Sequence, residues 1–169
     1  TMRAGEDAQG SILFYLLTYT VSTVGAFGAL IWCGSRGAEA VSYEDLAGVG
    51  KRHPAAGLAF SLFLLSLAGV PPTAGFFGKL YIVKSAIGAG LSSLAIILLL
   101  NSVLSAYYYL RVLVFMYMRE PAPGAPIATP MRSGYVATAL VLAGILVVVL
   151  GLWPTTSLQL AVEAALASR

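Results

Sequence analysis

Three basic side chains, Lys79, Lys84 and Arg111, lie within long apolar stretches of the sequence. The seven acidic residues fall instead in polar loops or tails: Glu6, Asp7, Glu39, Glu44, Asp45, Glu120 and Glu163. An ionisable group at membrane depth is costly and marks a functional site by default. Because the apolar stretches supply no acidic partner, we expect these cations to pair with water, a backbone carbonyl, a tyrosine or another polypeptide.

A double proline interrupts the apolar segment 53–88, which contains Lys79. As one helix this segment would rise about 50 Å, whereas a bilayer hydrocarbon core is about 30 Å thick. Each proline lacks the N–H that would bond the carbonyl four residues earlier, so the carbonyls of Leu67 and Ala68 lose their helical partners. The residue before each proline is also pushed out of the α region. We therefore predict a broken helix. The break is assigned to Gly69, Val70, Pro71, Pro72, Thr73 and Gly75.

Thr73 is predicted to cap a second half-helix that starts near Ala74. Lys79 then lies about a turn and a half into this half-helix, and its side chain should lean back toward the break. Desolvation and the positive end of the half-helix dipole disfavour the ammonium form, whereas free carbonyls of the first half favour it. Opposed effects of this kind suit a lysine that changes charge during a working cycle. The alternatives are a lysine that snorkels to an interface and a break that serves only packing; Lys84 is interpreted as snorkelling, with a secondary functional role left open.

The composition indicates an integral membrane protein, because 59% of the 169 residues are hydrophobic, 10% are charged and the mean hydropathy is +0.86. A single cysteine, Cys33, excludes an intrachain disulfide, and the single histidine, His53, lacks the neighbours of a metal site. His53 is kept as a secondary candidate. No phosphate loop, dinucleotide fingerprint or nucleophile elbow is present in the sequence. The polar opening decapeptide, which starts on Thr1 and lacks signal-peptide features, is interpreted as an exposed lead-in of a fragment.

We predict an all-α polytopic fold with four spans at about 11–33, 54–88, 91–118 and 135–153, the second of them discontinuous. Residues 34–52 and 119–133, the latter with the sequence PAPGAP, are predicted polar loops, and the tail after the fourth span is expected at the surface. In the third span Asn101 and Tyr108 are secondary candidates. An asparagine at membrane depth most often joins helices, a contribution of roughly 1 kcal/mol, and Arg111 is expected to snorkel to the nearby surface.

The distribution of basic residues predicts the orientation of the chain. The two loops hold Arg36, Lys51, Arg52, Arg119 and Arg132. The opposite side holds only the terminal Arg3 and Arg169. Because basic loops stay in the cytoplasm, we expect the loops inside and both termini outside.

At SLAGVPPTAGFFGKLYIVKSAI the sequence closely resembles the antiporter-like membrane subunits of proton-pumping NADH:quinone oxidoreductase, respiratory complex I. That family also includes multisubunit sodium/proton antiporters. Two further stretches resemble the same family and occur in the same order along the chain, FYLLTYTVSTVGAFGAL and NSVLSAYYYLRVLVFMY. The resemblance therefore covers nearly the whole chain. Within the family the sequence is most similar to the subunit N branch. The subunit M branch has a glutamate at the position of Lys79, and the subunit L branch follows its lysine with an acidic residue, where this chain has Leu80 and Tyr81.

The resemblance implies a proton-translocating, non-redox subunit of the oxidoreductase, driven by quinone reduction elsewhere in the complex, with Lys79 as a proton relay. The chain would correspond to the last four of fourteen spans in a bacterial plasma (inner) membrane. The partners would be other membrane-arm subunits and the lipid bilayer. This chain would bind no cofactor, and NADH, flavin, iron–sulfur clusters and quinone would belong to other subunits. An acid and two lysines of the family's preceding helices have no counterpart here, so the isolated chain is expected to be inactive.

Two other functions remain open from the sequence. A subunit of a sodium/proton antiporter would share these residues, because a lysine does not specify the ion. A structural membrane scaffold would use Lys79 only to anchor a neighbouring helix. Substitution of Lys79 separates the scaffold from a proton relay, because a scaffold would assemble poorly, whereas a relay variant would assemble and fail to pump.

Overall fold

The computed structural model describes residues 2–34, 42–121, 130 and 133–167. These residues form seven α-helices and one 3-10 helix, and no strand occurs among them. The elements in order are α1 (Met2–Cys33), η1 (Glu44–Leu46), α2 (Val49–Arg52), α3 (Pro54–Ala68), α4 (Ala74–Gly88), α5 (Ser92–Met118), α6 (Gly134–Leu152) and α7 (Pro154–Ala167). Within the described part, α5, α6 and the stretch Ala8–Cys33 of α1 are long and apolar enough to cross a membrane, and α3 is a shorter apolar helix. The all-α polytopic prediction is confirmed.

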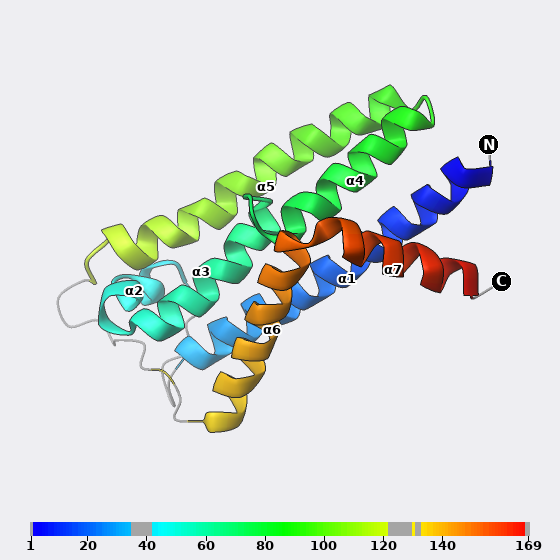
Figure 1. Cartoon of the computed structure of the whole chain (residues 1–169). Helices are drawn as coiled ribbons and strands as arrows, with labels where there is room; N and C mark the ends of the chain where they lie inside the picture. The colour runs from blue at the N-terminus through cyan, green and yellow to red at the C-terminus, as the bar shows by residue number, and fades with distance from the viewer. Residues whose placement is uncertain (1, 35–41, 122–129, 131–132, 168–169) are drawn as a thin grey trace.

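The second predicted span is divided between α3 and α4, which follow one another with an irregular connection at residues 69–73. Figure 1 shows α5 returning alongside them, with α1 on their other side. α1 packs against α3, α4, α6 and α7, so it is the central element of the bundle. Both termini lie at one end of the bundle, and α2 lies at the opposite end (Figure 1).

One sequence prediction about α1 is wrong. The helix begins at Met2, so the expected lead-in is part of the first helix, although Gln9 within it is exposed as predicted. Gly10 and Ser11 are buried, and a side chain at Gly10 would collide with Val162 of α7. The reason is tertiary, because the tail after the fourth span forms α7 and packs against α1.

A face of small residues on α1 allows close contact with α3. Ser22, Gly25 and Ala26 are buried there. A side chain at Gly25 would collide with the ring of Phe63, which is fully buried. Close packing of small residues is a common way to join helices in membranes, where lipid removes the hydrophobic drive for association.

At the loop end of the bundle, η1 and α2 pack against the last turns of α5. The guanidinium of Arg111 lies 5.0 Å from the ring centre of Tyr43, so Arg111 reaches the polar end of the bundle as expected. Arg36, Arg132 and all of PAPGAP except Pro121 lie outside the described residues.

Candidate functional site

The end of α3 is closed by backbone hydrogen bonds. Gly69 adopts a left-handed conformation with φ 84°, which glycine tolerates without steric cost. The N–H of Gly69 donates to the carbonyls of Leu65 and Ser66, each at 3.0 Å, and the N–H of Val70 donates to Leu65 at 3.0 Å. These bonds form the wrapped helix end known as a Schellman motif. They satisfy two of the terminal carbonyls of α3 and leave those of Leu67 and Ala68.

Lys79 binds the two remaining carbonyls. Its Nζ donates to the carbonyl oxygen of Leu67 at 2.8 Å and to that of Ala68 at 3.1 Å. These are the carbonyls whose helical partners the double proline removes. Buried backbone acceptors require partners, and in this break an ammonium group on the second half-helix supplies them. The side chain leans back toward the break as the sequence predicted.

A serine on α5 completes the surroundings of the amine. Nζ of Lys79 lies 3.4 Å from Oγ of Ser105, which accepts a hydrogen bond from it. The hydroxyl of Ser105 donates in turn to the carbonyl of Ser102 at 2.8 Å. The amine therefore joins three helices, because its acceptors belong to α3 and α5 while its own residue belongs to α4.

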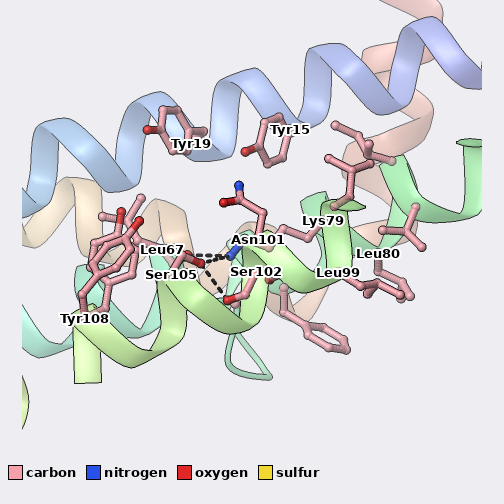
Figure 2. A pocket seen from close by; sticks show the side chains of 16 residues that line it. Tyr15, Tyr19, Leu67, Lys79, Leu80, Leu99, Asn101, Ser102, Ser105 and Tyr108 are labelled. Carbon is pink, nitrogen blue, oxygen red and sulfur yellow. Dashed lines mark hydrogen bonds between the residues drawn. The ribbon is translucent and has the colours of Figure 1, made fainter. Parts of the chain in front are cut away.

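A cavity of about 360 Å³ opens beside Lys79, between α1, α4 and α5. Its polar lining consists of Lys79, Asn101, Ser102, Ser105, Tyr15, Tyr19, Tyr108 and Tyr109. Figure 2 shows Tyr15 and Tyr19 on α1 across from Lys79, with the amide of Asn101 pointing toward α1. A water molecule occupies about 30 Å³ of liquid, so this volume is enough for roughly ten waters.

The secondary candidates lie in three places. Asn101 and Tyr108 line the cavity. Lys84 is exposed on α4 and does not line it, in keeping with a snorkelling side chain. His53 lies between α2 and α3 at the loop end of the bundle, so the structure does not bring it to Lys79.

The predicted role of Thr73 is only half right. Thr73 occupies the N-cap position of α4, but its side chain accepts no N–H from the helix. Its hydroxyl instead donates to the carbonyl of Val70 at 2.7 Å. The N–H of Gly75 donates to Oγ of Ser66 at 3.2 Å. Ser66 comes this close because Gly75 has no side chain, and a Cβ there would collide with the Ser66 carbonyl.

Ser105, Tyr15 and Tyr19 were not among the candidate site residues from the sequence. Ser105 lies on one helical face with the candidates Asn101 and Tyr108, at spacings of four and three residues, and this spacing could have identified it as part of the cavity wall on α5. No local signal marks Tyr15 and Tyr19, because they reach the cavity from another helix.

Comparison with known proteins identifies the family. Residues 1–105 match the family described as NADH:quinone oxidoreductase/Mrp antiporter, TM. A protein of Sorangium cellulosum, NADH-quinone oxidoreductase subunit N 1, is 80% identical over 169 residues, which is 100% of this chain and 33% of that protein. A protein of the same name in Solibacter usitatus is 42% identical over 95% of this chain and 33% of its own length. The chain thus spans about a third of the length of these relatives.

Two solved structures are similar in fold. Respiratory complex I from Thermus thermophilus with bound Aureothin contains a chain with a TM-score of 0.75 and 34% identity, over 89% of this chain and 34% of that one. The Mrp complex from Dietzia sp. DQ12-45-1b contains a chain with a TM-score of 0.74 and 23% identity, over 93% of this chain and 37% of that one. The second likeness concerns the fold alone. From the family match and the identity to its relatives, the chain belongs to the NADH:quinone oxidoreductase/Mrp antiporter family of membrane proteins.

Proposed function

We propose that the chain is the C-terminal portion of a proton-translocating membrane subunit, the counterpart of subunit N of NADH-quinone oxidoreductase, in which Lys79 relays protons. One observation carries the proposal. The amine of Lys79 holds both carbonyls freed by the double proline and borders a polar cavity. Broken helices at membrane depth are typical of ion sites in transporters, because unwound backbone can coordinate a cation.

The acceptors around Lys79 suit both protonation states of the amine. An ammonium group has three N–H donors, and three acceptors surround it: the carbonyls of Leu67 and Ala68 and the hydroxyl of Ser105. A neutral amine has two N–H donors and one lone pair. The two carbonyls can keep the two donors while the lone pair accepts from water in the cavity, or from the Ser105 hydroxyl once that hydroxyl turns away from the Ser102 carbonyl. Protonation and release then require no change of partner on the α3 side.

The direction of proton transfer follows from the chemistry of the partners. The carbonyls of Leu67 and Ala68 only accept hydrogen bonds and have no proton to pass on, so the proton path cannot continue through them. The Ser105 hydroxyl both accepts and donates, and it lies on the wall of a cavity with room for water. We therefore assign the exchange of protons with Lys79 to the Ser105 side of the amine.

The remainder of the path and the partners belong to the larger assembly. The proposal places the basic loops in the cytoplasm and both termini outside, in a bacterial plasma membrane. Other membrane-arm subunits are the partners of the chain, and the redox cofactors belong to other subunits. The isolated chain is expected to transport no protons or sodium in liposomes, because it spans a third of the relatives' length.

Coupled pumping in the complete complex tests the relay. Lys79→Ala should assemble, because alanine suits a helix and leaves no buried charge, and should lower pumping per quinone reduced at least tenfold. Lys79→Arg should restore little, because a guanidinium does not release its proton. The matched control is Lys84→Ala, on the same helix but exposed, which should pump normally.

Three outcomes separate the relay from its rivals at matched complex content. Equal pumping by Lys79→Ala and Lys84→Ala would make Lys79 a structural lysine. Misassembly of Lys79→Ala with a tolerated Lys79→Arg would indicate a scaffold. Pumping that depends on sodium in the medium and moves labelled sodium would indicate a sodium/proton antiporter.

A further inference from the structure

We infer that Ser66, held by Ser22, is a positioning residue of the lysine site: its hydroxyl caps α4 from α3 and so keeps the carbonyls of Leu67 and Ala68 against Lys79. The capping interaction stands on the geometry of the break alone. Its consequence for pumping rests on the proposed function.

The two serines form a buried hydrogen-bonded pair between α1 and α3. The Oγ atoms of Ser22 and Ser66 are 2.8 Å apart, and the residues are 1% and 0% exposed. Ser66 Oγ also accepts the N–H of Gly75 at 3.2 Å. A hydroxyl has one donor and two acceptor positions, so Ser66 can serve both partners at once. Buried polar groups that are fully partnered hold a specific arrangement, because the loss of one partner leaves another unsatisfied.

The bond from Gly75 has the geometry of a helix cap. Gly75 is the second residue of α4, and the first N–H groups of a helix lack partners within the helix. An N-cap side chain normally accepts from this position. Thr73, at the N-cap, uses its hydroxyl on Val70 instead, so Ser66 supplies the missing acceptor. An ordinary cap comes from the adjacent residue, whereas this one comes from the last turns of α3 and therefore ties the two half-helices together.

The cap and the lysine form two successive links between the same helix ends. Ser66 directly precedes Leu67 and Ala68 on α3, and Lys79 follows Gly75 by four residues, on the same face of α4. One link joins Ser66 to Gly75, and the other joins the two carbonyls to Lys79. Loss of the bond between Ser66 and Gly75 frees the start of α4 to move away from α3, and this movement lengthens the hydrogen bonds of Lys79. Ser22 acts indirectly, because it holds the Ser66 hydroxyl in place.

Hydrogen–deuterium exchange in the complete complex tests the cap directly. Ser66→Ala should speed exchange in the peptide that contains Gly75 about fivefold, the factor for one net hydrogen bond of about 1 kcal/mol. The matched control is Ser61→Ala. Ser61 is a buried serine of the same helix, but its hydroxyl donates to the carbonyl of Gly57 and lies 3.2 Å from the hydroxyl of Tyr117, near the loop end. That variant should leave exchange at Gly75 unchanged.

A double-mutant cycle tests the role of Ser22. Ser22→Ala alone should speed exchange at Gly75 about twofold, because the cap remains but its hydroxyl is less well held. The Ser22→Ala, Ser66→Ala double variant should exchange no faster than Ser66→Ala. Additive effects, or equal exchange in Ser61→Ala and Ser66→Ala, would overturn the inference.

The pH dependence of coupled pumping links the cap to Lys79. Ser66→Ala should change the pH of half-maximal pumping, because the acceptors around the amine move, and Ser61→Ala should not. If Lys79→Ala abolishes pumping but Ser66→Ala alters neither exchange nor this pH, the inference fails while the relay stands. If Lys79→Ala pumps normally and Ser66→Ala speeds exchange, the cap stands and the relay fails.

Discussion

The broken pair α3–α4 and the continuous helix α6 satisfy the same membrane requirement in different ways. α6 has 19 residues in one helix, and even its Thr138 hydroxyl donates to a carbonyl of the same helix, that of Gly134 at 2.9 Å. The break leaves the carbonyls of Leu67 and Ala68 to side-chain donation from Lys79, and the N–H of Gly75 is accepted by the side chain of Ser66. Membranes permit irregular backbone only where protein or trapped water satisfies it.

The difference in free carbonyl acceptors explains why a buried cation lies at the α3–α4 break and not along α6. In α6 every interior carbonyl is occupied, so a buried ammonium would find no acceptor on that helix. In α3–α4 the double proline creates the acceptors at the depth where the lysine reaches them. A break in one half-helix and a charge on the other are therefore complementary. The ammonium needs the two carbonyls as acceptors, whereas without the lysine the carbonyls can bond to water in the adjoining cavity.

The largest effect is expected from a lysine placed in the continuous helix. Val147 of α6 is fully buried, so Val147→Lys would introduce an ammonium without free carbonyls. A lysine at the centre of a membrane helix is unfavourable by about 2.5–3.5 kcal/mol on insertion scales, and we expect almost no assembled complex by quantitative immunoblot. Val147→Met, which lacks the charge, should assemble at reduced but measurable levels. Normal assembly of Val147→Lys would show that a break is not needed to house a lysine.

A smaller effect is expected from a methyl group in the break. Gly75→Ala would push a Cβ into the Ser66 carbonyl, and such overpacking usually destabilises by about 1–3 kcal/mol. Gly88→Ala is the control on the same helix, because nothing lies within 4 Å of a Cβ there. We expect Gly75→Ala to lower the thermal denaturation midpoint of the purified complex and Gly88→Ala to leave it unchanged. Equal midpoints would mean that the two half-helices do not need this close approach.

The smallest effect is expected from the conventional cap residue. Thr73→Val removes the hydroxyl bond to Val70, but the Val70 carbonyl still accepts the N–H of residue 73 at 3.1 Å. The loss of stability should therefore be under about 1 kcal/mol, with coupled pumping unchanged. A loss as large as that of Ser66→Ala would show that Thr73, rather than Ser66, caps α4.

The sequence predicted those features that depend on local backbone chemistry. Pro71 and Pro72 located the break and identified the two carbonyls that would be free, because the missing N–H groups act at a fixed spacing. The spacing of Lys79 from the break predicted the direction of its side chain. Uninterrupted apolar runs predicted α5 and α6 to within two residues at each end.

Other features depend on contacts between distant parts of the chain and left no local signal. Ser22 and Ser66 are 44 residues apart, and no rule of local sequence pairs them. The cap was assigned to Thr73 because capping rules consider the adjacent residue, whereas the acceptor came from α3. The start of α1 was misplaced for the same reason, because Gly10 is buried by α7 from the other end of the chain.

The two half-helices also determine how this part of the chain enters the bilayer during synthesis. α3 and α4 have 15 residues each, about 22 Å, so neither crosses a hydrocarbon core of about 30 Å alone. The uncharged stretches of α1 and α6 are long enough to partition into lipid independently as they leave the insertion machinery. We expect α3–α4 to integrate only when α1 offers Ser22 and α5 offers Ser105, so the lysine site is completed in the same step that brings its own helices into the membrane.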